Sequence, residues 1–218
     1  MKGHILLIGG GEIFKKETSV IDDAIKILAL KGSSLVFFPT AAGDSQGYID
    51  TIVDTFGDTF EVIGVIEEKG KKFAEDALLS ASVIYLGGGK TELLLDLFER
   101  WNLVPLLYKA LERGGIISGM SAGAQALSDE YVDYDEHNME VKKGWGLVPI
   151  FCMVHSQQTS AKKAKDVYES VDDNLKNTFV AIGENAAWQI DALGERKIGI
   201  GNAWVLDGIG LDRKLVML

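Results

Sequence analysis

Short apolar runs alternate along this chain with longer stretches in which apolar positions recur at helical spacing. Each short run ends in glycine or turn residues, which predicts strands over residues 5–8, 34–38, 61–66, 83–86 and 116–118. The stretches between the runs predict amphipathic helices over residues 18–30, 48–56, 71–79 and 91–100. Strands that alternate with helices are typical of an α/β fold in which helices cover both faces of a parallel sheet.

The pattern changes in the last quarter of the chain. From Phe179 onward, glycines interrupt shorter apolar runs, which predicts antiparallel strands over residues 180–182, 187–190, 198–200 and 203–206. No proline-, serine- or glycine-rich linker divides the 218 residues. We therefore expect a single domain over residues 1–218.

Glycine-rich segments follow several of the predicted strands. Residues 9–11 are glycines after the first strand, and residues 87–89 are glycines after the fourth. The fifth strand runs directly into residues 119–123, which read Gly-Met-Ser-Ala-Gly. Since α/β proteins place their sites where the carboxyl ends of parallel strands meet, we expect these segments to lie together.

The Gly-x-Ser-x-Gly pattern is that of a nucleophile elbow. Its glycines permit a sharp turn from strand to helix, which lifts the Ser121 hydroxyl off the backbone. The amide of Ala122 then lies free at a helix N-terminus, beside that hydroxyl. The competing interpretation is a glycine-rich turn with an incidental serine.

A serine nucleophile needs a base, usually a histidine that a third group orients. His155 ends an otherwise apolar run, although a buried structural histidine is an alternative interpretation. His4 opens a predicted strand at its amino end and His137 lies in a polar loop, so both are weaker candidates. Glu184 follows an apolar run and a glycine, and it is either the orienting acid or a turn residue.

Together these segments resemble the peptidase E and cyanophycinase group of serine peptidases, which has a class I glutamine amidotransferase-like fold. The resemblance lies in five ordered segments: the two glycine loops, the Ser121 segment, residues 144–148 leading to His155, and the segment around Glu184. It implies a flavodoxin-like three-layer α/β/α architecture with a mostly parallel central sheet and short C-terminal antiparallel strands.

The resemblance also implies roles for particular residues. Ser121 would be the nucleophile, His155 the base and Glu184 the third member of a triad. The backbone amides implied for the oxyanion are those of Ala122, Gly88 and Gly89. The implied activity is that of a serine exopeptidase or dipeptidase that forms an acyl-enzyme with small peptides and uses no cofactor.

Three departures from the family pattern leave the substrate open. The residue after the second glycine loop is commonly asparagine, but here it is Lys90, which either contacts an acidic substrate group or points into solvent. The aspartyl dipeptidases carry an additional acid after the nucleophile, and the candidates here include Asp133 and Asp135. The arginines that often follow the histidine are missing from residues 156–163. The sequence therefore does not assign a preference for an amino-terminal aspartate.

The charge balance narrows the class of partner. With 22 basic and 32 acidic residues the formal charge is −10, which disfavours nucleic acid and anionic membrane surfaces. We expect a small peptide substrate and a monomer or homodimer. The N-terminus has no signal-peptide pattern and no apolar run reaches membrane-spanning length, so we expect a cytoplasmic protein.

Other interpretations compete with a serine peptidase. Cys152, the only cysteine, lies outside the elbow and is more simply a buried thiol, and no Cys/His spacing suits zinc. The segment Gly89-Lys90-Thr91 imitates the end of a phosphate-binding loop in a flavodoxin-like nucleotide-binding module, but it lacks that loop's first glycine. A catalytically silent relative that binds a small molecule is the third possibility.

Overall fold

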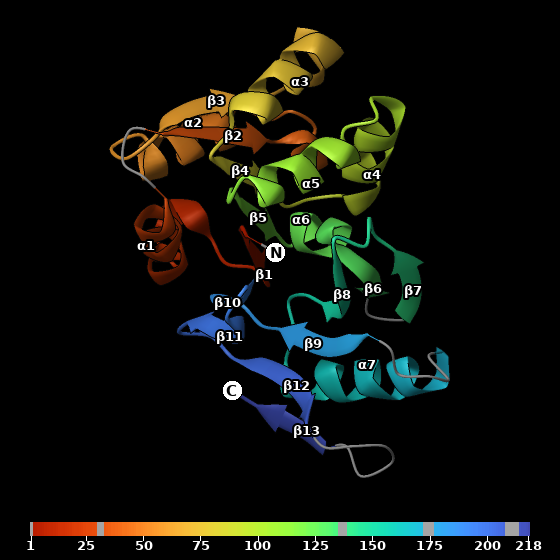
Figure 1. Ribbon diagram of the computed structural model, residues 1–218. Helices are drawn as coiled ribbons and strands as arrows, with labels where there is room; N and C mark the ends of the chain where they lie inside the picture. Colours follow the sequence, from red (N-terminus) through yellow and green to blue (C-terminus); the bar gives the residue numbers. More distant parts are fainter. Residues whose placement is uncertain (1, 30–32, 135–138, 172–176, 208–213) are drawn as a thin grey trace.

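The computed structural model describes residues 2–29, 33–134, 139–171, 177–207 and 214–218. Its central sheet has the strand order β11-β10-β1-β5-β4-β2-β3 (Figure 1). The parallel part of this sheet consists of β1 (His4–Ile8), β2 (Ser34–Phe38), β3 (Glu61–Gly64), β4 (Val83–Leu86) and β5 (Ile116–Met120). The predicted parallel α/β sheet is therefore confirmed, with a shorter third strand and a longer fifth strand.

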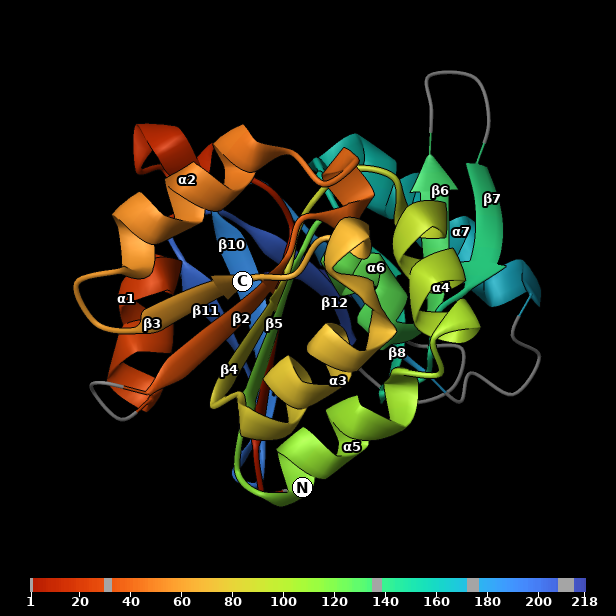
Figure 2. The ribbon, with the colours of Figure 1, turned by 90° about the horizontal axis from the view of Figure 1, so that it is seen from above.

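Helices cover both faces of the central sheet. Seen from above, α1 and α2 lie on one side of the strands, and α3, α5 and α6 lie on the other (Figure 2). The helices over the described residues are α1 (Ser19–Leu28), α2 (Gln46–Phe56), α3 (Gly70–Ser80), α4 (Thr91–Arg100), α5 (Val104–Glu112), α6 (Ala122–Leu127) and α7 (Gln158–Val171). Short 3₁₀ helices follow three of the strands, namely η1 (Ile13–Lys15), η2 (Thr40–Ala42) and η3 (Glu67–Lys69).

Alternate side chains of β1 pack into two separate cores, one on each face of the central sheet. Leu6 and Ile8 pack in the core on the α1 and α2 side, whereas Ile5 and Leu7 pack in the core on the opposite side. All four side chains are completely buried. Apolar side chains on both faces of a strand are what a sheet with two covered faces requires.

A second sheet was not predicted. It has the strand order β13-β12-β9-β8-β6-β7. Its strands are β6 (Ser128–Tyr134), β7 (Met139–Lys143), β8 (Val148–Met153), β9 (Thr178–Ile182), β12 (Ala203–Asp207) and β13 (Lys214–Met217). The predicted strand at 180–182 exists and pairs antiparallel with β12, as expected, and it also pairs in parallel with β8, which was not predicted.

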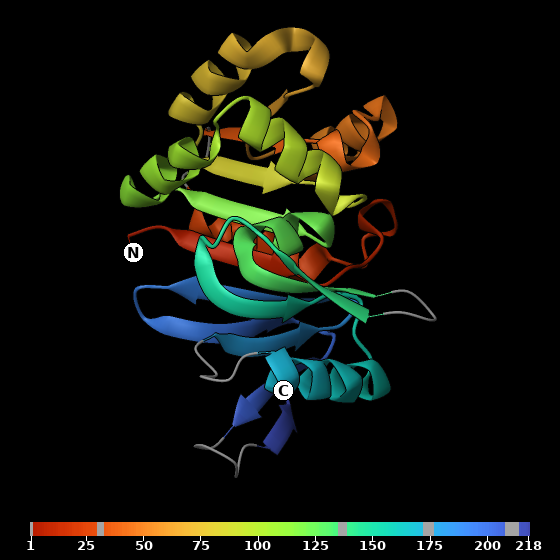
Figure 3. The same cartoon turned by 90° about the vertical axis from the view of Figure 1, so that its right-hand side faces the viewer.

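The last five strands of the chain are divided between the two sheets. Strands β10 (Ala186–Asp191) and β11 (Gly194–Gly199) return to the central sheet, where β10 pairs antiparallel with β1. Helix α7 covers the second sheet on the side away from the central sheet (Figure 3). This arrangement brings the ends of β8 and β9 next to the end of β1, where the candidate site lies.

Candidate active site

Three predicted side chains form one hydrogen-bonded chain. Ser121 Oγ lies 2.8 Å from His155 Nε2, and His155 Nδ1 lies 2.5 Å from Glu184 Oε1. Ser121 stands between β5 and α6, His155 follows β8, and Glu184 lies between β9 and β10. Each ring nitrogen of the imidazole therefore contacts one partner, as in a Ser-His-acid triad.

The backbone at Ser121 has the shape of an elbow. Its φ is 48° and its ψ is −105°, a conformation that residues with a side chain rarely adopt. Ser121 N–H donates to Ile8 O at 2.8 Å, and Ser121 O accepts from Gln125 in the first turn of α6. The strained turn is thus held from both sides, and strain of this kind is concentrated at functional sites.

The carboxyl end of β1 joins the three segments of the triad. Three successive carbonyl groups accept backbone hydrogen bonds from them. Ile8 O accepts from Ser121 N, Gly9 O accepts from His155 N at 2.9 Å, and Gly10 O accepts from Asn185 N at 3.1 Å. The sequence indicated a glycine loop here but not this joining role, which depends on contacts with the second sheet.

Gly10 also lies directly against the imidazole. A Cβ at this position would be 2.6 Å from His155 Nδ1 and 2.7 Å from His155 Cε1, and it would also collide with Glu184 Oε2. Real Cβ atoms do not approach so closely, so a side chain here would displace the His155–Glu184 pair. The backbone at Gly10 has φ of +155° as well.

The second glycine loop lies beside the serine. A Cβ on Gly88 would be 3.4 Å from Ser121 Cβ. Gly88 N–H donates to Tyr48 Oη at 3.2 Å, and that hydroxyl donates to Met120 Sδ at 3.5 Å. Gly89 N–H has no hydrogen-bond partner among the described residues, and Ala122 begins α6 directly after the serine. Sequence reasoning missed Tyr48, because nothing in the helix pattern marks its hydroxyl.

The candidate substrate residues Lys90 and Asp133 lie at the start of α4 and on β6. Lys90 is exposed at the start of α4. Asp133 pairs with Lys142 at 2.5 Å, and Lys142 also pairs with Glu92 at 2.8 Å. These hydrogen bonds raise the pKa of Lys142 and lower that of Glu92. Asp133 is therefore already engaged, while Asp135 lies outside the described residues.

Cys152 and His4, two further candidates from the sequence, lie outside the hydrogen-bonded chain. Cys152 is completely buried within β8, and burial raises the pKa of its thiol to about 12, so the reactive thiolate is disfavoured. His4 pairs with Asp191 at 3.3 Å, at the amino end of β1. His137 lies outside the described residues. Within the described ranges, no cluster of three or more His, Cys, Asp or Glu side chains is suited to a metal ion.

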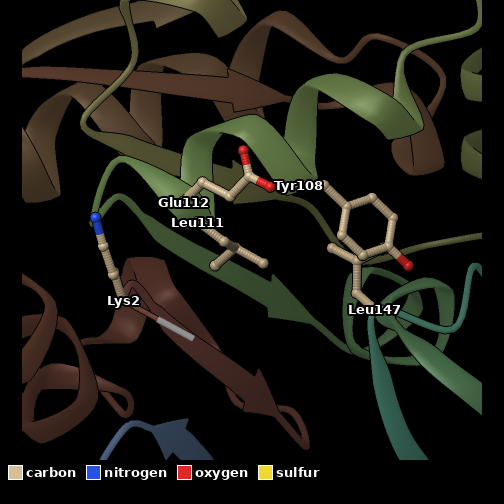
Figure 4. A pocket seen from close by; sticks show the side chains of 5 residues that line it. All are labelled: Lys2, Tyr108, Leu111, Glu112 and Leu147. Atoms are coloured by element: carbon tan, nitrogen blue, oxygen red, sulfur yellow. The ribbon is translucent and has the colours of Figure 1, made fainter.

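One cavity lies away from the triad. It has a volume of about 600 Å³ and lies between Lys2 and Glu112 on one side and Tyr108 and Leu147 on the other (Figure 4). Because Lys2 precedes β1, this cavity is at the amino end of the strand, opposite the triad. A cavity of about 310 Å³ includes Met120, the residue before Ser121, and Tyr48, which contacts Gly88. Its other lining residues are Gly11, Glu12, Ile13, Phe14, Gly47 and Thr51.

The chain is similar to known peptidases in sequence and in fold. It is 32% identical over 136 residues to the uncharacterized peptidase YgaJ of Bacillus subtilis (strain 168), a match that covers 61% of this chain and 59% of the relative. A peptidase from an acI-B1 actinobacterium superposes with a TM-score of 0.70 at 21% identity, covering 98% of this chain and 93% of that one. A protein described as a peptidase E of Listeria monocytogenes EGD-e superposes with a TM-score of 0.65 at 16% identity, covering 91% and 99%.

The two solved structures show that the fold is shared. No helix of the described residues is long and apolar enough to cross a membrane. The model of peptidase family S51 matches residues 5–196, which include every segment of the triad. The chain belongs to peptidase family S51.

Proposed function

We propose that the protein is a serine peptidase that hydrolyses small peptides through an acyl-enzyme on Ser121. The observation that carries this proposal is the hydrogen-bonded chain from Ser121 Oγ through His155 to Glu184, set at a strained elbow. Membership of peptidase family S51 and the peptidase YgaJ as a relative support the same activity.

The proposed reaction has two halves. Ser121 Oγ attacks the peptide carbonyl while His155 Nε2 takes the hydroxyl proton, and His155 then returns that proton to the leaving amine. A water molecule next attacks the ester while His155 takes one of its protons; the bond from the acyl carbon to Ser121 Oγ then breaks, His155 gives the proton to Ser121 Oγ, and the free acid leaves. Glu184 orients the imidazole and stabilises its charged form through Nδ1.

Backbone amides would stabilise the oxyanion in both halves. The candidates are the N–H groups of Ala122, which begins α6, and of Gly89, which has no partner among the described residues. Gly88 N–H is a third candidate, although it donates to Tyr48 in this structure. One such donor contributes roughly 3 kcal/mol in comparable sites. This chemistry uses protein groups and water alone.

The single free cysteine fits the cytoplasmic location that we propose with this activity. Cys152 is buried and takes part in no disulfide. Proteins of oxidising compartments more often carry disulfides, and those of the cytosol rarely do.

The test compares wild type with Ser121→Ala on a panel of dipeptides, tripeptides and β-aspartyl peptides. The variant should lose at least about a thousandfold in kcat, because the nucleophile and its base act as a unit. Cys152→Ala serves as the matched control and should keep the wild-type rate. A peptide that Ser121→Ala and wild type hydrolyse at the same rate would exclude the proposed mechanism.

A further inference from the structure

The second glycine loop packs against α6, the helix that follows the nucleophile. Leu86, the last residue of β4, leads directly into this loop at residues 87–89. A Cβ on Gly123, the second residue of α6, would lie 2.4 Å from Leu86 O and 2.8 Å from Leu86 Cβ. Real Cβ atoms do not approach so closely, so α6 reaches the start of the loop only because residue 123 has no side chain.

The end of the loop is joined to the same helix by a buried hydrogen bond. Thr91, the first residue of α4, lies two positions after the last glycine of the loop. Thr91 Oγ1 donates to Gln125 Oε1 in α6 at 2.5 Å. Thr91 is only 5% exposed and Gln125 only 8%, so water does not compete for this bond. Breaking it would leave buried polar groups without partners, which is costly.

Gln125 is held in one orientation by its other contacts. Its Nε2 donates to Val132 O in β6 at 3.1 Å, and its backbone N–H donates to Ser121 O at 3.0 Å. Its backbone carbonyl accepts from Ser128 Oγ at 2.7 Å. Because Val132 O requires a donor, the carboxamide must direct its nitrogen to β6 and its oxygen to Thr91.

These contacts lie next to the amides proposed for the oxyanion. Gly89 lies two residues before Thr91, and Ala122 lies three residues before Gln125. Ala122 is the first residue of α6, so its N–H has no acceptor within the helix. Gly89 N–H has no hydrogen-bond partner among the described residues. The bond from Thr91 to Gln125 is therefore a direct side-chain connection between the two segments that carry these amides.

We infer that Thr91 and Gln125 are positioning residues for the oxyanion site. Their hydrogen bond sets the distance between the second glycine loop and the first turn of α6, and with it the separation of Gly89 N–H and Ala122 N–H. The inference rests on the proposed peptidase function and adds two residues to its machinery. Placement matters for such donors, since a displacement of about 1 Å costs on the order of a hundredfold in rate.

The experiment uses substitutions that separate the hydrogen bond from the shape of the side chain. Thr91→Val keeps the shape and removes the hydroxyl, whereas Thr91→Ser keeps the hydroxyl. Gln125→Met is an independent variant that removes the acceptor. Ser128→Ala is the matched control, because it removes a buried hydrogen bond to the backbone of Gln125 and leaves the bond from Thr91 in place. Urea unfolding gives the stability of each variant, and rates are measured where each is folded.

The first readout is the second-order rate constant with which a small fluorophosphonate labels Ser121. In this reaction Ser121 Oγ bonds to phosphorus, His155 takes the hydroxyl proton and fluoride leaves, while the phosphonyl oxygen occupies the place of the oxyanion. The probe therefore reports on the oxyanion site without a known peptide substrate. The second readout is kcat and KM for a peptide of the panel that wild type hydrolyses.

The inference predicts that Thr91→Val and Gln125→Met are labelled about tenfold or more slowly than wild type, since loss of a whole oxyanion donor costs about a hundredfold or more. Their kcat should fall by a similar factor with KM nearly constant, because the amides act in the transition state. Thr91→Ser and Ser128→Ala should stay within about threefold of wild type in both readouts, although Ser128→Ala loses a buried hydrogen bond.

Two results would overturn the inference and leave the peptidase activity standing. One is a Thr91→Val protein that is less stable than wild type but is labelled and turns over at the same rate, since the bond would then support only the fold. The other is equal slowing in Ser128→Ala and Thr91→Val. Failure of the peptidase proposal looks different: wild type itself would show neither labelling at Ser121 nor hydrolysis that depends on Ser121, and the positioning role would fail with it.

Discussion

The carboxyl edge of the central sheet and the layers beneath it differ in backbone conformation and in exposure. At the edge, Ser121, His155 and Asn185 have positive φ values of 48°, 51° and 58°. The side chains of His155 and Glu184 are about half exposed. Within β1, only a few residues before that edge, Leu6 and Leu7 are extended and completely buried.

The contrast indicates that different parts of the molecule carry reactivity and stability. Strain and exposure at the edge cost folding free energy, which the buried layers must offset. Substitutions at the edge should therefore change rates with little change in stability, and substitutions beneath it should do the reverse. The following predictions test that separation.

The largest effect is expected for His155→Ala. It removes the base, so kcat for the peptide found in the panel should fall by at least about a thousandfold. Because the side chain is half exposed, the free energy of unfolding in urea should change by less than about 1 kcal/mol. A large loss of stability would show that the edge also supports the fold.

Gly10→Ala should reduce activity by about a hundredfold or more, because displacing a catalytic pair by about 1 Å has costs of that size. The new methyl group would collide with His155 and Glu184, which are exposed and free to move aside. Gly43→Ala is the control, since its φ is also positive, at +66°, but a Cβ there meets nothing within 4 Å. Equal activity in the two variants would contradict the joining role of the first glycine loop.

The pH dependence of the free energy of unfolding tests the role of the buried Asp22. Burial raises its pKa from 3.8 to about 6 in the folded protein, so the folded state binds the proton more tightly than the unfolded state. The contribution of Asp22 to stability is then fully present below about pH 4 and falls as pH rises to about 6, by up to about 3 kcal/mol. Urea unfolding of Asp22→Asn should lack this fall, so its advantage over wild type should grow with pH; an advantage independent of pH would contradict the prediction.

Tyr48→Phe should have the smallest effect. It removes the hydroxyl that accepts from Gly88 N–H and donates to Met120 Sδ, and a single hydrogen bond of this kind contributes about 1 kcal/mol. A freer glycine loop should lower kcat by about fivefold and leave KM nearly constant. A rise in KM alone would instead make Tyr48 a wall of the substrate pocket.

The sequence predicted the parts of this molecule that depend on local pattern. The five parallel strands follow from short apolar runs that end in glycine or turn residues. Ser121, His155 and Glu184 were candidates because each follows an apolar run, and the resemblance to a peptidase family implied their roles. The second sheet could not be predicted, because four of the seven residues of β6 are Ser, Asp or Glu and its parallel pairing with β8, across about 20 residues of chain, leaves no local signal. The same long-range pairing hides the role of Gly10 and the hydroxyl contacts of Tyr48.

The cavity between α1 and α2 was hidden for a related reason. Asp22 and Asp54 lie on separate helices and look like ordinary solvated acids in an amphipathic pattern. Only the packing of α1 against α2 shows that one of them is buried and that both line one cavity. Lys90, Asp133 and Asp135 were named from the sequence only as candidate substrate contacts, with a solvent-facing Lys90 as the alternative, and a contact between Lys90 and substrate stays a prediction.

The most direct measurement of the central claim is labelling with a fluorophosphonate followed by peptide mapping. That claim is that His155 activates Ser121 as the nucleophile. The account predicts one modified residue, Ser121, with labelling that slows by at least about a hundredfold in His155→Ala and is unaffected in Cys152→Ala. Labelling of another residue, or labelling of Ser121 at the same rate without His155, would contradict it.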